Sequence, residues 1–181
     1  MRWTHPTRGA IRPDIFILAA EETGSIRELT EWTLIQALAD SSALRRAGYD
    51  LKVSVNVSGR VLCDLAFRDF VLHTVGARAH ELCLEVTETA VIESPQAAIA
   101  AVSAFRQAGL AISIDDYGVG LSSLSYLKTL EADELKLDRS IATAVSTERD
   151  RLILRSTIEL AHSLNMKVVA EGVEDAAVEA V

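Results

Sequence analysis

The sequence is poor in proline and cysteine, and each shortage excludes certain classes of protein. Only 3 prolines among 181 residues, together with 49% hydrophobic residues, exclude an intrinsically disordered chain. The 2 cysteines, Cys63 and Cys83, form no CxxC pair, and no secretory segment is evident, so we expect a reducing, cytoplasmic location. No apolar run is long enough to span a membrane.

Positive charge is also scarce. The 18 lysines and arginines are outnumbered by 26 aspartates and glutamates, which gives a net charge of −8. This balance argues against DNA or another nucleic acid as a partner. A phosphate ligand would be repelled by the protein alone, so its binding would require a cation.

What the sequence does contain is a strand followed by a helix, repeated along the chain. Strands are predicted at 52–59, 82–88, 111–116, 134–138 and 167–172, and helices at 15–20, 25–46, 64–75, 94–109, 122–130 and 148–164. The helix at 25–46 is expected to begin with a capping box formed by Ser25 and Glu28. This order predicts a parallel α/β fold in one domain.

The predicted strands alternate between aliphatic and small or polar residues. Val53, Val55 and Val57 share one face, for example, and Asn56 lies on the other. Helices on the aliphatic face and a polar interior are typical of a (β/α) barrel, whose site lies at the carboxyl ends of its strands. A doubly wound open sheet is the alternative, but it normally buries aliphatic residues on both faces. We therefore favour the barrel.

Polar residues gather near the carboxyl ends of these strands: Asn56, Glu85, Asp115, Asp116, Lys136, Asp138 and Glu171. All the candidate ligand atoms are oxygens, which suit Mg²⁺, Mn²⁺ or Ca²⁺ rather than Zn²⁺. Alone, Asp115 and Asp116 could be turn residues, and Lys136 could simply pair with Asp138. Lysine beside a carboxylate-bound Mg²⁺ also fits an enolase-like barrel, which would need a carbon acid as its substrate.

Six short segments of the sequence resemble the successive motifs of EAL domains, in the same order and over nearly the whole chain. They are residues 2–6, 54–58, 84–88, 115–118, 135–140 and 169–174. Members of this family are bacterial phosphodiesterases that hydrolyse cyclic di-GMP to linear pGpG. The resemblance implies a modified TIM barrel with two divalent ions, Mg²⁺ or Mn²⁺, and inhibition by Ca²⁺. It leaves open a homodimer and accompanying sensor or GGDEF domains.

The resemblance also implies roles for individual residues. The ligands of a first metal ion correspond to Asn56, Glu85, Asp115 and Glu171, and Asp116 corresponds to the ligand of a second. Lys136 and Glu171 correspond to catalytic positions, with Lys136 orienting or deprotonating the attacking water. Arg2 and Asp138 correspond to substrate contacts. Glu88 corresponds to the carboxylate that anchors the loop after Asp116 and links metal occupancy to dimer contacts.

The sequence departs from the family pattern in several places. The Glu-Ala-Leu motif would lie just before Arg2, and the first strand, most of the second, and the last helix and strand are absent, so 1–181 is expected to be a partial domain. Val119 and Leu121 stand where the family commonly has threonine and tyrosine. The alternative function is therefore a catalytically inactive relative, acting as a cyclic di-GMP receptor or a protein-interaction module.

Overall fold

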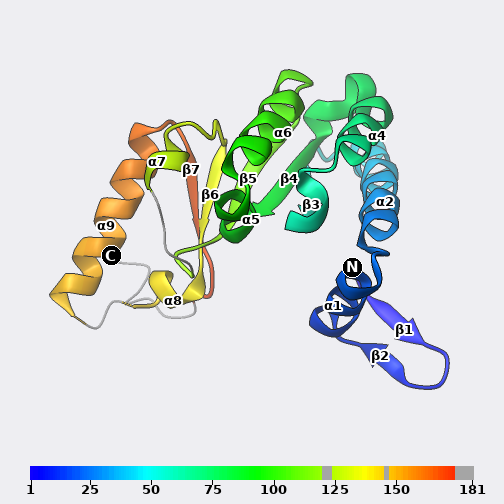
Figure 1. Ribbon diagram of the computed structural model, residues 1–181, viewed down its shortest axis with the longest axis horizontal. Coiled ribbons are helices and arrows are strands. Elements are labelled where there is room, and N and C mark those ends of the chain that lie inside the picture. Colours follow the sequence, from blue (N-terminus) through cyan, green and yellow to red (C-terminus); the bar gives the residue numbers. More distant parts are fainter. Residues whose placement is uncertain (120–123, 145–146, 174–181) are drawn as a thin grey trace.

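The computed structural model describes residues 1–119, 124–144 and 147–173, and these form a parallel sheet with helices outside it (Figure 1). The sheet contains β3 (Val53–Val57), β4 (Leu82–Thr87), β5 (Ala111–Tyr117), β6 (Glu134–Leu137) and β7 (Lys167–Ala170). The longer helices around it are α2 (Ile26–Arg46), α4 (Leu65–Val75), α6 (Pro95–Gln107) and α9 (Glu148–Ser163). Short helices connect them: α3 (Gly59–Leu62), η1 (Gly76–Glu81), α5 (Glu88–Glu93), α7 (Leu124–Leu127) and α8 (Arg139–Ala142).

The strands lie side by side in their sequence order, β3-β4-β5-β6-β7, and every neighbouring pair is parallel. A barrel requires this sequential order, whereas a doubly wound sheet reverses its strand order at a switch point. The predicted α/β class and barrel-type strand order are therefore confirmed. Within the described residues the five strands do not close into a barrel, because no strand pairs with the outer edge of β3 or of β7.

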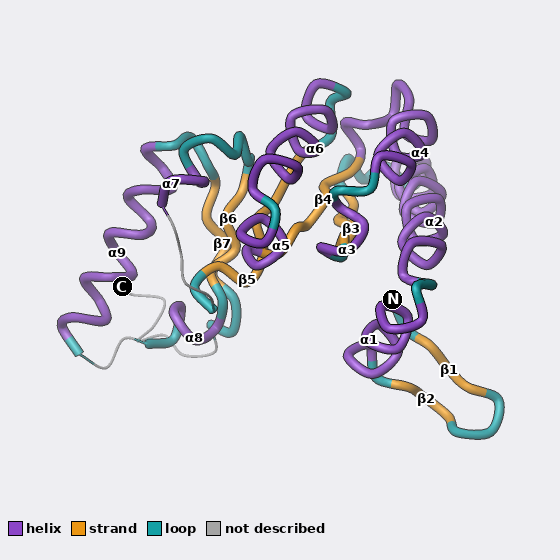
Figure 2. The backbone as a smooth tube through the Cα atoms, viewed as in Figure 1, coloured by secondary structure: helices purple, strands orange, loops and turns teal. Residues whose placement is uncertain are grey.

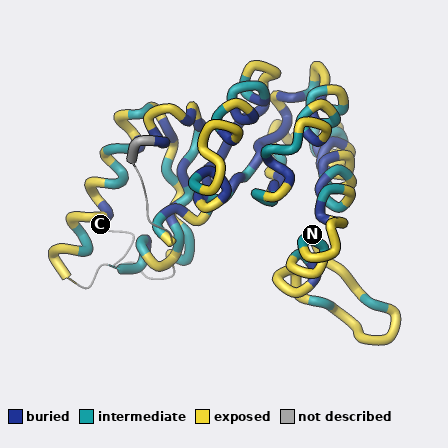
Figure 3. The backbone as a smooth tube through the Cα atoms, viewed as in Figure 1, coloured by how far each residue is buried: buried dark blue, intermediate teal, exposed yellow. Residues whose placement is uncertain are grey.

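Many residues of the central strands are buried (Figure 3), and they include those predicted to form the aliphatic face of the sheet. Leu84, Ile112 and Leu135, on three neighbouring strands, are at most 1% exposed and belong to one hydrophobic cluster with residues of α2, α4 and α6. Burial of each such side chain stabilises the fold by about 1.5–3 kcal/mol. This packing leaves the opposite face of the sheet for the polar residues.

The first residues form an arm apart from the sheet (Figure 2). The arm contains an antiparallel hairpin, β1 (Trp3–His5) and β2 (Gly9–Ile11), followed by α1 (Pro13–Thr23). The Trp3 ring packs edge-on against Phe16 of α1, with ring centroids 5.9 Å apart. This contact holds the hairpin against the helix.

The capping box predicted at Ser25 and Glu28 is wrong. Ser25 itself has helical dihedral angles (φ −82°, ψ 0°) and its side chain makes no capping hydrogen bond. Ser25 does occupy the predicted N-cap position of α2, and its carbonyl accepts the N–H of Leu29. A capping side chain acts from an extended residue, however, so the side chain of the helical Ser25 does not form the box. The extended residue Thr147 instead forms a capping box with Asp150 at the start of α9.

Candidate metal and catalytic site

A β-bulge in β5 brings the two adjacent aspartates to the same face of the sheet. Ile114 pairs with Leu135 and Tyr117 pairs with Leu137, so β5 has one more residue than β6 over this interval. The side chains of Ile114 and Tyr117 are both buried in the aliphatic core. Asp115 and Asp116 between them therefore both project towards the polar face, with Asp116 in the left-handed conformation (φ 55°).

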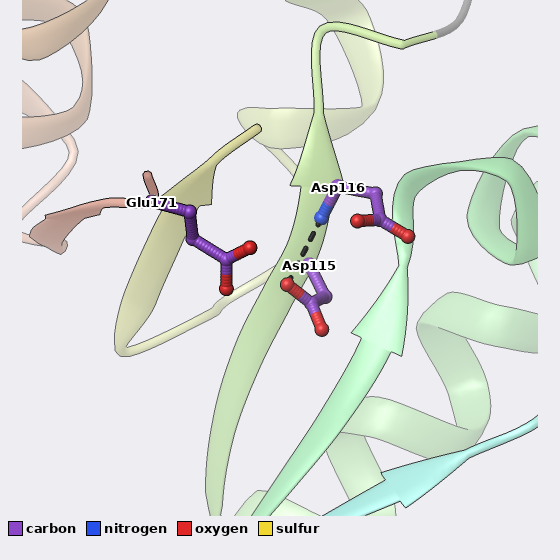
Figure 4. Close-up of side chains that lie close together, drawn as sticks. All are labelled: Asp115, Asp116 and Glu171. Atoms are coloured by element: carbon purple, nitrogen blue, oxygen red, sulfur yellow. Dashed lines mark hydrogen bonds between the residues drawn. The ribbon is translucent and has the colours of Figure 1, made fainter. Parts of the chain in front are cut away.

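Three carboxylates converge at the carboxyl ends of β5 and β7. Asp115, Asp116 and Glu171 each offer an oxygen atom, and these atoms lie within 4.8 Å of one another (Figure 4). Burial, followed by the charges of Asp115 and other nearby carboxylates, raises the pKa of Asp116 above its usual value. This donor set is all oxygen and carries concentrated negative charge, so it fits a hard divalent cation such as Mg²⁺ or Mn²⁺.

Lys136 of β6 lies among these carboxylates. Its Nζ atom is 2.8 Å from Oδ1 of Asp115, 2.8 Å from Oε1 of Glu171 and 3.7 Å from Oε2 of Glu85. Burial lowers the pKa of Lys136, but its hydrogen bonds to Asp115 and Glu171 and the charge of Glu85 outweigh this effect and raise the pKa overall. In this arrangement Lys136 is a protonated cation that binds the candidate metal ligands directly.

Asp138 does not pair with Lys136, contrary to the alternative considered from the sequence. Its Oδ1 atom accepts a hydrogen bond of 2.8 Å from the backbone N–H of Ser140 and so caps α8. Hydrogen bonds from Ser140 lower the pKa of Asp138. Within the described part of the chain, the ion pairs of Lys136 are with Glu85, Asp115 and Glu171.

Glu88 lies behind the bulge and is only 1% exposed. Its Oε2 atom accepts a hydrogen bond of 2.8 Å from the backbone N–H of Gly118, and its Oε1 atom accepts one of 2.6 Å from the hydroxyl of Tyr126. Nothing in the sequence identified Tyr126, because an aromatic residue between leucines looks like an ordinary core position.

The remaining predicted residues lie at the margins of this cluster. Asn56 of β3 is exposed and lies opposite Glu85 in the register of β3 and β4. Arg2 lies in the N-terminal arm, where it lines a hollow of about 550 Å³ with Trp3, Phe16 and Trp32. Among the described residues, no hydrogen bond or ion pair joins Arg2 to the carboxylates. Leu121 and Glu174, which belong to the sequence motifs, lie outside the described residues.

Comparison with known proteins identifies relatives of this chain. The EAL domain family model matches residues 1–180. The cyclic di-GMP phosphodiesterase NbdA of Pseudomonas aeruginosa is 41% identical over 179 residues, which cover 96% of this chain and 23% of NbdA. The cyclic di-GMP phosphodiesterase PdeR of Escherichia coli is 34% identical, with coverages of 97% and 27%. The chain thus spans about a quarter of the length of these relatives.

Solved structures show the same fold. The PaMucR phosphodiesterase in complex with c-di-GMP is 36% identical and has a TM-score of 0.87, over 99% of this chain and 74% of that one. The FimX EAL domain of Xanthomonas citri, also with a TM-score of 0.87, is 22% identical and supports the fold alone.

Proposed function

Because the chain belongs to the EAL domain family, we propose that it hydrolyses cyclic di-GMP to linear pGpG in bacterial second-messenger signalling. The observation that carries this proposal is the convergence of Asp115, Asp116 and Glu171 around Lys136 at the carboxyl ends of three strands. The relatives named cyclic di-GMP phosphodiesterase support the choice of substrate. An enolase-like reaction on a carbon acid has no such support.

The carboxylate cluster is the proposed metal site. Asp115, Asp116 and Glu171 would hold the metal, and we propose that Asn56 and Glu85 complete the ligands of two Mg²⁺ or Mn²⁺ ions. When bound, these ions would polarise the phosphoryl oxygen, lower the pKa of the attacking water and stabilise the leaving alkoxide. The donors fit this assignment because hard divalent cations prefer oxygen ligands.

The protein's own residues would supply orientation and charge. Lys136 is held between Asp115 and Glu171, so its ammonium has a fixed position from which to orient the attacking water. Glu171 is the second proposed catalytic residue, because it binds the ammonium of Lys136 and would also hold a metal ion. Arg2 and Asp138 are proposed to contact the substrate, and the two hydrogen bonds of Glu88 support its proposed role as the anchor of the loop after Asp116.

The proposal is tested by following cyclic di-GMP and pGpG in the full-length protein with different cations. Mg²⁺ and Mn²⁺ should support hydrolysis, Zn²⁺ should not be required, and Ca²⁺ should compete without turnover because its larger coordination shell misplaces the water. Asp115→Asn should abolish turnover, and Asp14→Asn, which changes an exposed aspartate in the N-terminal arm, is the matched control. Equal hydrolysis in excess chelator would contradict the metal assignment. Tight dinucleotide binding without hydrolysis under every condition would favour the inactive receptor.

The context of the domain is also proposed. Within the part of the chain that the structure describes, the outer edges of β3 and β7 are unpaired. This supports the view that residues 1–181 are part of a larger EAL-type domain, as does the 74% coverage of the PaMucR chain. No helix among the described residues is long and apolar enough to cross a membrane. We propose a cytoplasmic location, and sensor or GGDEF domains and a second copy of the chain as partners.

A further inference from the structure

The buried carboxylate of Glu88 has hydrogen bonds from two different parts of the chain. One oxygen accepts the N–H of Gly118, just after β5, and the other accepts the hydroxyl of Tyr126 in α7. Within the described residues, Glu88 forms no ion pair, so these neutral donors are what compensate its buried charge there. Loss of the hydroxyl would leave Oε1 without its hydrogen-bond donor among the described residues, and the side chain would then be driven to find another donor.

The Gly118 peptide is closely fixed, and it lies two residues after Asp116. Gly118 has φ 104°, and a Cβ atom there would lie 1.9 Å from Cδ1 of Ile141 in α8. The N–H of Asp138 donates to the carbonyl of Tyr117 at 3.2 Å. The turn that follows β5 is therefore held from two sides. Ile141 of α8 and the N–H of Asp138 contact it on the side of β6, and Glu88 contacts it on the side of β4.

Asp116 has a backbone conformation that is uncommon for residues other than glycine, although aspartate adopts it more readily than most. Its left-handed φ of 55° persists only where the surroundings hold it. The hydrogen bond between Glu88 and Gly118 is a contact close enough to do so. A side chain that orients Glu88 therefore controls where the carboxylate of Asp116 points.

We propose that Tyr126 is a positioning residue for the metal site. Its hydroxyl holds Glu88 in the orientation that receives the Gly118 N–H, and this in turn holds Asp116 as a metal ligand. The inference rests on the proposed function only in taking the carboxylate cluster as a site for a divalent cation. It assigns a role to a residue outside the carboxylate cluster itself.

The test compares Tyr126→Phe with Tyr49→Phe in the full-length protein. Tyr49 is 59% exposed and forms no part of this network, so it is the matched control for loss of a hydroxyl. Mn²⁺ affinity is measured without dinucleotide from the electron paramagnetic resonance signal of free Mn²⁺. Tyr126→Phe should raise the Kd for Mn²⁺ about tenfold, as expected for a residue that orients a ligand, and Tyr49→Phe should leave it unchanged.

A double-mutant cycle then shows whether Tyr126 acts through Glu88. In a Glu88→Ala background, Tyr126→Phe should cause no further change in the Kd for Mn²⁺. At saturating Mn²⁺ the kcat of Tyr126→Phe should return close to that of the wild type, because the chemical groups are intact. If Glu88→Ala does not fold, the comparison of the two Tyr→Phe variants decides.

Each outcome supports or overturns the inference. Unchanged Mn²⁺ affinity in Tyr126→Phe, even with a lower Tm, would reduce Tyr126 to a packing residue. A tenfold loss that persists in Glu88→Ala would show that Tyr126 does not act through Glu88. A wild-type protein that binds Mn²⁺ but does not hydrolyse cyclic di-GMP would contradict the proposed function and leave the inference standing. A wild-type protein that binds no Mn²⁺ would overturn both.

Discussion

Replacement of Lys136 by methionine should separate catalysis from binding and from stability. The ammonium lies 2.8 Å from both Asp115 and Glu171, so it occupies the same carboxylates that we propose for the metal. Methionine retains most of the aliphatic side chain and removes the charge. Lys167→Met is the matched control, because Lys167 is exposed at the opposite end of the neighbouring strand β7.

The size of the effect should depend on the metal. A hydrogen bond to a charged group contributes about 1.5–3 kcal/mol, but the Glu171 side chain is 40% exposed and its contribution is reduced by solvent. In chelator we therefore expect Lys136→Met to lower the free energy of unfolding by about 2 kcal/mol. A bound divalent cation would neutralise the same carboxylates, so Mg²⁺ should raise the Tm of this variant more than that of the wild type.

Catalysis should respond differently from stability. If the Lys136 ammonium orients the attacking water, its loss should lower kcat on the order of 10²-fold or more. Dinucleotide affinity, measured with Ca²⁺ to prevent turnover, should change little, because the proposed phosphate contacts are the metals and Arg2. A Lys136→Met protein that is destabilised but turns over at the wild-type kcat would refute the catalytic role. An equal gain in Tm from Mg²⁺ in both proteins would refute the idea of shared ligands.

Three further predictions concern the metal, the turn after β5 and acid stability. Glu85→Ala should weaken metal binding, so the loss of hydrolysis should be partly reversed by high Mn²⁺ in a titration. In chemical denaturation, Gly118→Ala should destabilise the protein by about 1–3 kcal/mol more than Gly9→Ala. Both glycines have positive φ, but only at Gly118 would the added Cβ atom collide with Ile141. Equal losses of stability in the two variants would contradict the close packing. Hydrogen bonds from Arg78 and Ser41 lower the pKa of Glu81 from 4.5 to about 2, so its stabilising contribution should be complete above pH 4.5 and lost as the pH falls towards 2. The Tm difference between wild type and Glu81→Gln should shrink over that range, and a constant difference would contradict the assignment.

The sheet and most of the site could be predicted because each strand carries its own signal. Alternation of residues such as Leu84 and Glu85 determines which side chain is buried, and parallel strands bring their carboxyl ends to one edge. Lys136 and Glu171 could therefore be assigned to one site although they lie 35 positions apart in the sequence. The predicted start of a helix at Asp64 is also confirmed, and the Asp64 side chain there accepts hydrogen bonds from two backbone N–H groups.

Features that depend on contacts between distant segments could not be predicted. Strict alternation places Asp115 and Asp116 on opposite faces, and only pairing with β6 reveals the bulge between Ile114 and Tyr117. The hydroxyl of Tyr126 has a role only because Glu88, 38 residues earlier, lies beside it in the fold. The N-terminal hairpin likewise depends on the contact between the ring of Trp3 and α1.

The balance of charge explains why these carboxylates and a cation belong together. One ammonium, that of Lys136, lies among Glu85, Asp115 and Glu171, and it can neutralise only one of their three charges. The bulge adds Asp116, which forms no ion pair within the described residues and has a raised pKa. Such a cluster is costly in a protein that already carries a net charge of −8. A divalent cation would supply the missing positive charge, and the backbone bonds around Gly118 would keep Asp116 within reach of it.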